Sequence, residues 1–225
     1  SPLTEENKPV WGTCPDNSTP TPITDTNIHE AVNTCLSTNP VDGMCSDSEY
    51  GPITEWDVSN VTNMYDLFVF KTQFNGDISS WDVSNVTNMG NMFRGTPFNQ
   101  EIGNWDVSSV SNMVAMFDGA SGFNQPIGGW DVSNVTSMWQ MFFNANTFNQ
   151  DLSTWCVPNI VSEPVEFISS RSPLIESYKP VWGTCPTASI DDQYFTNLSM
   201  YPNPVENSLF ISGNDTPILV SIYNV

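Results

Sequence analysis

The stretch Trp56-Asp57-Val58-Ser59-Asn60-Val61-Thr62-Asn63-Met64 opens a unit that the chain repeats several times. The tryptophans that begin successive units lie 25, 24, 25 and 25 residues apart, and the first four are each followed by Asp-Val-Ser. These tryptophans are Trp56, Trp81, Trp105, Trp130 and Trp155. A fixed period of this length is the signature of a repeat architecture in which each unit packs on its neighbours.

The rest of each unit is also constant in its apolar positions. A second valine, a methionine and a Met-Phe or Leu-Phe pair follow the opening motif, and each unit then has Phe-Asn and one aliphatic residue. In the first unit these residues are Val61, Met64, Leu67, Phe68, Phe74, Asn75 and Ile78. A single unit cannot enclose so many apolar side chains, whereas stacked units bury them in a continuous core.

Two local periods predict secondary structure inside each unit. Apolar and polar residues alternate over 56–59, which is the period of a short half-buried strand. The apolar residues at 64, 67 and 68 are spaced i, i+3 and i+4, which is typical of one helical face, and Thr62 can cap that helix. The sequence therefore predicts an α/β solenoid with parallel short strands and short helices, followed by part of a small all-β domain.

The repeated motif resembles that of the BspA-like leucine-rich-repeat surface proteins. The resemblance rests on Trp-Asp-Val-Ser-Asn-Val-Thr-Asn-Met followed by Met-Phe and Phe-Asn-Gln, and it covers roughly residues 50–160. It is closest to their 25-residue subclass, a bacterial surface domain of unknown function. The resemblance implies a leucine-rich-repeat-like solenoid, display outside the cell, adhesion in some members, and no catalytic residues.

The repeat divides the chain into six segments. Residues 1–22 read as the end of a preceding repeat unit and a linker, because residues 1–15 reappear almost unchanged at 172–186. Residues 23–55 are expected to form an N-terminal cap with a helix over 26–36, and residues 56–155 the four-coil solenoid. Residues 156–186 are expected to close the far end, residues 187–196 to form a linker, and residues 197–225 to form a β-type segment.

The 5 cysteines predict two disulfides and one cysteine without a partner in the chain. We expect Cys35–Cys45 in the front cap and Cys156–Cys185 in the rear cap, each contributing roughly 3 kcal/mol on a loop-entropy model. Cys14 matches Cys185 in the duplicated block, so its expected partner lies in a preceding array. The alternatives are a free Cys14 or a different pairing.

The C-terminal segment changes character. Residues 201–204 read Tyr-Pro-Asn-Pro, and the apolar runs 209–211 and 218–223 predict two strands. This opening resembles the C-terminal sorting domain recognised by type IX secretion, here truncated, which implies export across an outer membrane and then release or attachment. The alternative is an ordinary small β domain.

Composition excludes several function classes. The net charge of -20 disfavours binding to nucleic acid and to anionic lipid, and no apolar run predicts insertion into a membrane. His29 is the only histidine, and its surroundings lack the second histidine of a zinc-protease helix. Each acidic position of the repeat recurs as copies of one residue, whereas catalysis needs distinct groups in one pocket. The chain is therefore expected to be non-catalytic and to need no cofactor.

The acidic column of the repeat is the main candidate site. On an exposed strand face, Asp and Ser side chains would project outward from every coil. These residues are Asp57, Ser59, Asp82, Ser84, Asp106, Ser108, Asp131 and Ser133. The favoured interpretation of the four Asp residues is that each accepts backbone N–H bonds at a turn, and the alternative is Ca²⁺ bridging between coils.

Two function classes fit these patterns. The first is a secreted or cell-surface repeat protein that mediates adhesion, with surface polysaccharide or host and neighbour-cell proteins as partners. The second is a structural spacer that displays other modules, with Ca²⁺ stabilisation as a further option. A contiguous exposed aromatic patch would favour the first class, and Trp139 and Phe143 are the candidates because they lie off the repeating core positions.

Overall fold

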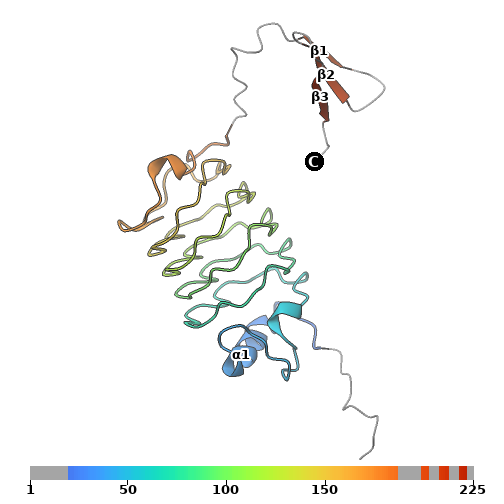
Figure 1. Ribbon diagram of the computed structural model, residues 1–225, viewed down its shortest axis with the longest axis vertical. Coiled ribbons are helices and arrows are strands. Elements are labelled where there is room, and N and C mark those ends of the chain that lie inside the picture. Colours follow the sequence, from blue (N-terminus) through green and yellow to red (C-terminus); the bar gives the residue numbers. More distant parts are fainter. Residues whose placement is uncertain (1–19, 187–198, 203–207, 213–217, 222–225) are drawn as a thin grey trace, which may run out of the picture. The chain divides into compact units, whose positions relative to one another are not determined.

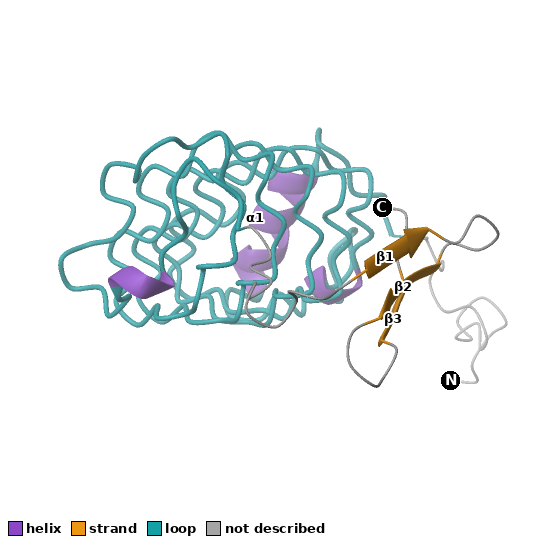
Figure 2. Ribbon diagram, turned by 90° about the horizontal axis from the view of Figure 1, so that it is seen from above, coloured by secondary structure: helices purple, strands orange, loops and turns teal. Residues whose placement is uncertain are grey.

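A computed structural model of the chain describes residues 20–186, 199–202, 208–212 and 218–221. The chain divides into two compact units, Ser1–Pro186 and Thr187–Val225. In the first unit, successive coils of the chain lie one behind another between two caps (Figure 1). We call residues 56–155 the repeat stack. Helices of the described first unit are limited to α1 (Ile28–Thr38) and two short 3-10 helices, Ile53–Glu55 and Glu176–Tyr178 (Figure 2).

The coils of the repeat stack contain neither the predicted strand nor the predicted helix. Residues 56–58 have no regular secondary structure, residues 59–60 lie in a turn, and residues 65–70 form a run of turns. The described coils share only isolated parallel bridges, such as Asn63↔Asn88 and Asn88↔Asn112. The expected α/β leucine-rich-repeat-like solenoid with strands and helices is therefore wrong, because these coils are built from turns.

The hydrogen bonds explain why no helix forms. Phe68 N donates to Met92 O at 3.0 Å and Phe93 N donates to Met116 O at 2.9 Å, so these N–H groups bind the next coil instead of the preceding helical turn. Local bonds such as Leu67 N to Met64 O, at 3.3 Å, close β-turns between them. Asp66 has a φ of 60°, as the third residue of a type II turn requires. Consecutive turns thus place residues 64, 67 and 68 on one side without a helix.

Two columns of stacked phenylalanines fill the core. Phe68, Phe93 and Phe117 stack from coil to coil with ring centroids 5.7 and 5.6 Å apart. Within each coil the second phenylalanine stacks on the first, as Phe74 does on Phe68 at 4.1 Å. The methionines at 64, 89, 113 and 138 are fully buried beside these rings, which confirms the prediction that they fill the core.

The repeated tryptophans join each coil to the preceding one. The indole Nε1 of Trp81 donates to Ile53 O at 2.9 Å, and that of Trp130 donates to Ile102 O at 3.0 Å. Trp105 and Trp155 make the same bond to Ile78 O and Ile127 O. A buried carbonyl without a partner would be costly, so an aromatic residue with an N–H donor suits this position.

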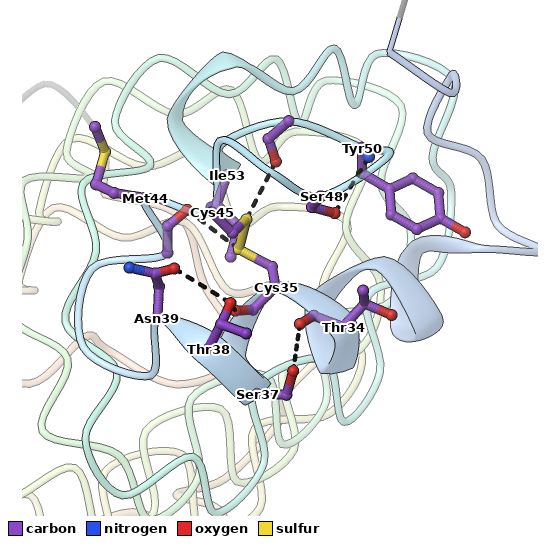
Figure 3. The surroundings of a disulfide bond; sticks show 12 residues. Thr34, Cys35, Ser37, Thr38, Asn39, Met44, Cys45, Ser48, Tyr50 and Ile53 are labelled. Carbon is purple, nitrogen blue, oxygen red and sulfur yellow. Dashed lines mark hydrogen bonds between the residues drawn. A yellow bond between two sulfur atoms is a disulfide. The ribbon is translucent and has the colours of Figure 1, made fainter. Parts of the chain in front are cut away.

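The front cap is built around α1 and one disulfide. The helix predicted over 26–36 is present as α1, and its buried face carries the predicted Ile28, Val32, Cys35 and Leu36. The predicted Cys35–Cys45 disulfide is confirmed, and it ties α1 to the loop before the first coil (Figure 3). Gly43, at a φ of 69°, allows this loop to turn against Ile53.

The front cap also occupies the hydrogen-bonding edge of the first coil. Within the stack, Thr87 N donates to Thr62 O at 2.8 Å, so the first coil lacks a preceding carbonyl for Thr62 N. Asp25 supplies that acceptor, because its Oδ1 accepts from Thr62 N at 2.8 Å and its Oδ2 from Thr62 Oγ1 at 2.7 Å. The prediction that Thr62 caps a helix is therefore wrong, and its hydroxyl binds the cap.

The rear cap pairs with the last coil in the same manner. Phe142 N donates to Phe167 O at 2.9 Å, and Leu152 N donates to Tyr178 O at 2.8 Å. The ring of Trp182 packs edge-on against that of Phe167, with centroids 5.0 Å apart. The predicted Cys156–Cys185 disulfide is confirmed and closes this cap. Cys14 lies outside the described residues.

The second unit contains an antiparallel three-stranded sheet. Its order is β1 (Ser199–Pro202), β2 (Ser208–Ser212) and β3 (Ile218–Ser221). Ser199 pairs with Ser212, and Ser208 pairs with Ser221. The strands predicted at 209–211 and 218–223 correspond to β2 and to β3, respectively. The Tyr-Pro-Asn-Pro motif begins within β1, and its last two residues lie outside the described residues.

Candidate interaction surface

The Asp-Ser motif of each coil forms a local turn. Asp57 Oδ1 accepts hydrogen bonds from Ser59 N at 3.0 Å and from Ser59 Oγ at 2.6 Å. Asp82 and Asp106 repeat both bonds with Ser84 and Ser108, and Asp131 accepts from Ser133 N at 3.0 Å. The prediction that each Asp accepts a backbone N–H at a turn is thus confirmed. The predicted strand face is absent, although the Asp side chains are exposed.

Hydrogen bonding lowers the pKa of three Asp residues in the acidic column. The Ser hydroxyl two residues on is the main cause that lowers the pKa of Asp57, Asp82 and Asp106, and the Ser N–H adds to it. At Asp82 the carboxylates of Asp57 and Asp106 act in the opposite direction, as neighbouring like charges do. The column is therefore a line of negative charges at neutral pH.

The serines of this column are committed to contacts within the protein. The hydroxyls of Ser59, Ser84 and Ser108 donate to Asp. The carbonyls of Ser59 and Ser133 accept from Asn85 Nδ2 and Asn159 Nδ2 at 2.9 and 2.8 Å. Within the described part of the chain, no three Asp, Glu, His or Cys side chains converge as a metal site would require. The column can therefore attract a partner by its negative charge, but its described residues do not converge as the ligands of a metal ion would.

The Phe-Asn motif forms a second ladder of polar contacts. Asn75 Oδ1 accepts from Asn99 N at 2.8 Å, and Asn99 Oδ1 accepts from Asn124 N at 2.9 Å. Asn149 continues this ladder from Asn124. The ladder lies at the surface, because Asn99, Asn124 and Asn149 are exposed.

A column of uncharged residues, three of them large and exposed, crosses the turn segments of the coils. Its members are Tyr65, Gly90, Val114, Trp139 and Val165, one from each successive coil, and we call it the apolar stripe. The residue after each member donates its N–H to the carbonyl of the next member, as Asp66 N does to Gly90 O at 2.9 Å and Ala115 N does to Trp139 O at 2.8 Å. The members are therefore neighbours in space.

Three members of the stripe are exposed, and the first of them, Tyr65, is held in place by its neighbours. Tyr65, Trp139 and Val165 are 40%, 46% and 70% exposed. The Tyr65 ring covers Gly90, since a Cβ on that glycine would lie 2.8 Å from Tyr65 Cδ2. Asn91 Nδ2 donates to the Tyr65 hydroxyl at 3.0 Å. The ring therefore bridges the position at which the stripe has no side chain, and its orientation is fixed before any partner binds.

The aromatic residues named from the sequence differ in their surroundings. Trp139 belongs to the apolar stripe, whereas Phe143 is half-buried and lies in the column that contains Arg94 and Asp118. In that column Arg94 Nε binds Asp118 Oδ2 at 2.8 Å, and the guanidinium lies 5.5 Å from the centroid of the Phe70 ring. Phe143 therefore lies in a packed column, and Trp139 in an open one.

The other notable features of the described first unit are a surface histidine and a cavity beside the front disulfide. His29 lies on the surface of α1, and its Nε2 donates to Tyr65 O at 2.8 Å. A cavity of about 400 Å³ beside the front disulfide is lined by hydroxyl and amide groups, with Asp47 as its acidic residue. Among the described residues, no helix has the length and apolarity needed to cross a membrane.

The sequence did signal the stripe, although weakly. Position 65 and its counterparts hold Tyr, Gly, Val, Trp and Val, whereas the preceding position is Met in the first four units and the position two residues later is Leu or Met there. Large apolar residues at a variable, exposed position favour a binding role over a packing role. The sequence did not reveal that Tyr65 pairs with Gly90. The Tyr65 ring covers the place that a side chain at Gly90 would occupy.

The comparisons with known proteins identify a family and no characterised relative. No curated protein and no solved structure matches the chain. The family model described as "Mycoplasma protein of unknown function, DUF285" matches residues 41–155 and residues 90–172. The first match alone spans just over half of the 225 residues and contains the whole repeat stack. The chain therefore belongs to the DUF285 family.

Proposed function

We propose that this chain is a non-catalytic, exported repeat protein that adheres to extended partners outside the cell. The observation that carries the proposal is the apolar stripe, in which Tyr65, Trp139 and Val165 are exposed while the repeated Trp, Val, Met and Phe positions of the stack are buried. Exposed apolar side chains that line up along a rigid surface are typical of interaction sites.

Export is supported by two further features. The disulfides Cys35–Cys45 and Cys156–Cys185 are typical of chains that fold in an oxidising compartment. The resemblance of the repeat to BspA-like surface proteins, and of the segment from residue 197 to a type IX sorting domain, supports a location on or beyond the outer surface. The repetition of the stripe over five coils suits a polymeric partner, because weak contacts add along a chain.

Adhesion of beads that carry the whole chain tests this proposal. Retention should be measured on bacterial and host cell surfaces, and it should fall severalfold for Trp139→Val, which places in the stripe the residue found at Val114. Asp82→Asn combined with Asp106→Asn is the matched control for the acidic column. Equal retention of all variants and of beads without protein would favour the spacer function, since the polar columns are satisfied within the stack.

A further inference from the structure

The shape of the apolar stripe limits the kind of partner that it fits. The stripe is one residue wide and five coils long. A stable interface with a folded protein buries roughly 800 Å² on each side around an apolar centre, which a single column of side chains does not provide. A linear polymer that lies along the stack can contact the exposed Tyr65, Trp139 and Val165 without requiring a wider surface.

The groups beside the stripe determine the charge of that polymer. On one side lie Asn88 and Asn112, whose amides are linked at 2.9 Å, and on the other lie Asp66, Gln140 and Glu166. The chain as a whole carries a net charge of -20. Anionic polymers and a second copy of this chain are therefore repelled, and a neutral polymer is not.

The aromatic members suit sugar rings. Tyr65 is held by Asn91 and lies across Gly90, and Trp139 is 46% exposed three coils further along. Flat aromatic faces with polar edges bury the apolar face of a ring while amide groups nearby accept and donate hydrogen bonds. The described surface offers these two platforms on one straight line, with Val114 between them.

We propose that the apolar stripe binds a neutral linear polysaccharide that runs along the repeat stack, with sugar rings on Tyr65 and Trp139. This inference rests on the proposed adhesive function and names its ligand class. Polar groups of the sugars bind the flanking amides, and the acidic column remains outside the contact.

Binding should be measured by calorimetry with the whole chain and three soluble neutral polymers, a β-glucan, a mannan and an α-glucan. At least one should bind, and Trp139→Val and Tyr65→Val should each weaken it roughly tenfold, as expected for the loss of one aromatic contact. Phe70→Gly is the matched control, because it removes an exposed aromatic residue outside the stripe at a position where the next coil has Gly95. It should leave the affinity unchanged within twofold.

Several outcomes separate this inference from the proposed function. Cell adhesion that depends on Trp139, without binding of any neutral polymer, overturns the ligand class and leaves adhesion intact. Binding of polylysine that competes with cell adhesion and disappears in high salt overturns it in favour of a cationic protein partner. If the wild-type chain shows neither cell adhesion nor binding of any polymer, the proposed function is overturned together with the ligand class.

Discussion

Gly95 shows how closely single residues are matched between coils. Its φ is 68°, and a Cβ at this position would lie 2.6 Å from Phe70 Cδ1 in the preceding coil. Gly119 has a similar φ of 71°, but a Cβ there would be 3.5 Å from its nearest neighbour, which is an ordinary contact. The two glycines thus share a backbone requirement, and only Gly95 also needs space for a ring.

Substitution of these glycines should separate the two requirements. Gly95→Ala should lower the free energy of unfolding by about 2–3 kcal/mol, and Gly119→Ala by about 1–2 kcal/mol for the backbone alone. In a chain that already carries Phe70→Gly, Gly95→Ala should lower the free energy of unfolding only as much as Gly119→Ala does, because no ring then lies over residue 95. Chemical denaturation measures all three variants, and equal costs for Gly95→Ala and Gly119→Ala would show that Phe70 does not cover Gly95.

Asp25 is the residue through which the front cap replaces a missing coil. Burial raises the pKa of this carboxyl, but the hydrogen bonds from the Thr62 hydroxyl and from Thr62 N and Asn63 N outweigh it and lower the pKa below 3.8. A carboxyl with a lowered pKa in the folded state stabilises the fold above its unfolded pKa. That contribution is lost as the pH falls through the folded pKa.

The pH dependence of Asp25→Asn should show this contribution. At pH 7 the variant should unfold more readily than the wild type, and the difference should shrink below about pH 4. Asp47→Asn is the matched control, because it removes one negative charge from the same cap without touching Thr62. A difference between wild type and Asp25→Asn that stays constant from pH 7 to pH 2 would exclude a charge-assisted cap.

At the scale of elements, the sequence predicted which residues are buried better than it predicted the backbone. The alternation over 56–59 exists as burial, because Trp56 and Val58 point inward, yet an Asp-Ser turn produces it instead of a strand. The i, i+3 and i+4 spacing at 64, 67 and 68 has a similar origin in consecutive turns. Residues with positive φ, such as Asp66, Ala115 and Gln140, give no turn signal of the kind that glycine gives.

The caps were more predictable because local chemistry fixes them. The apolar face of α1 follows from residue spacing, and the two cysteine pairings were predicted with a different pairing left open. Asp25 could not be found because its partner is 37 residues away. The stripe was predictable at Trp139 and not at Tyr65. A tyrosine paired with a glycine one repeat later is visible only once the register between coils is known.

The rear cap should depend on its disulfide. Replacement of Cys156 and Cys185 by Ser should lower the free energy of unfolding by about 3 kcal/mol, because the unfolded chain regains the freedom of a 29-residue loop. The contact of Trp182 with Phe167 should weaken, so tryptophan fluorescence should shift to longer wavelength. Unchanged stability and fluorescence would mean that the hydrogen bonds from Leu152 and Val157 close the cap alone.

At the scale of the whole molecule, charge works against stacking. The net charge is -20, and the stack repeats its Asp column in every coil, so neighbouring carboxylates repel one another. What holds the coils together is the buried aromatic and methionine core with the hydrogen bonds between coils. Salt should screen the repulsion and leave the core unaffected.

Thermal unfolding should therefore shift to higher temperature, by a few degrees, between low salt and roughly physiological salt. CaCl₂ and NaCl at equal ionic strength should act alike if the Asp residues are only turn caps. A much larger stabilisation by Ca²⁺ would support metal bridging between coils, and a fall in the unfolding temperature with NaCl would show that ion pairs dominate.

The central claim is that each turn segment of the repeat binds the next coil through its backbone, which also places the members of the apolar stripe side by side. Scalar couplings across hydrogen bonds, measured by NMR, test it directly. We predict correlations from Phe68 N to the carbonyl carbon of Met92, from Phe93 N to that of Met116 and from Phe117 N to that of Met141. Correlations from these amides to carbonyls four residues earlier would indicate helices and contradict the account.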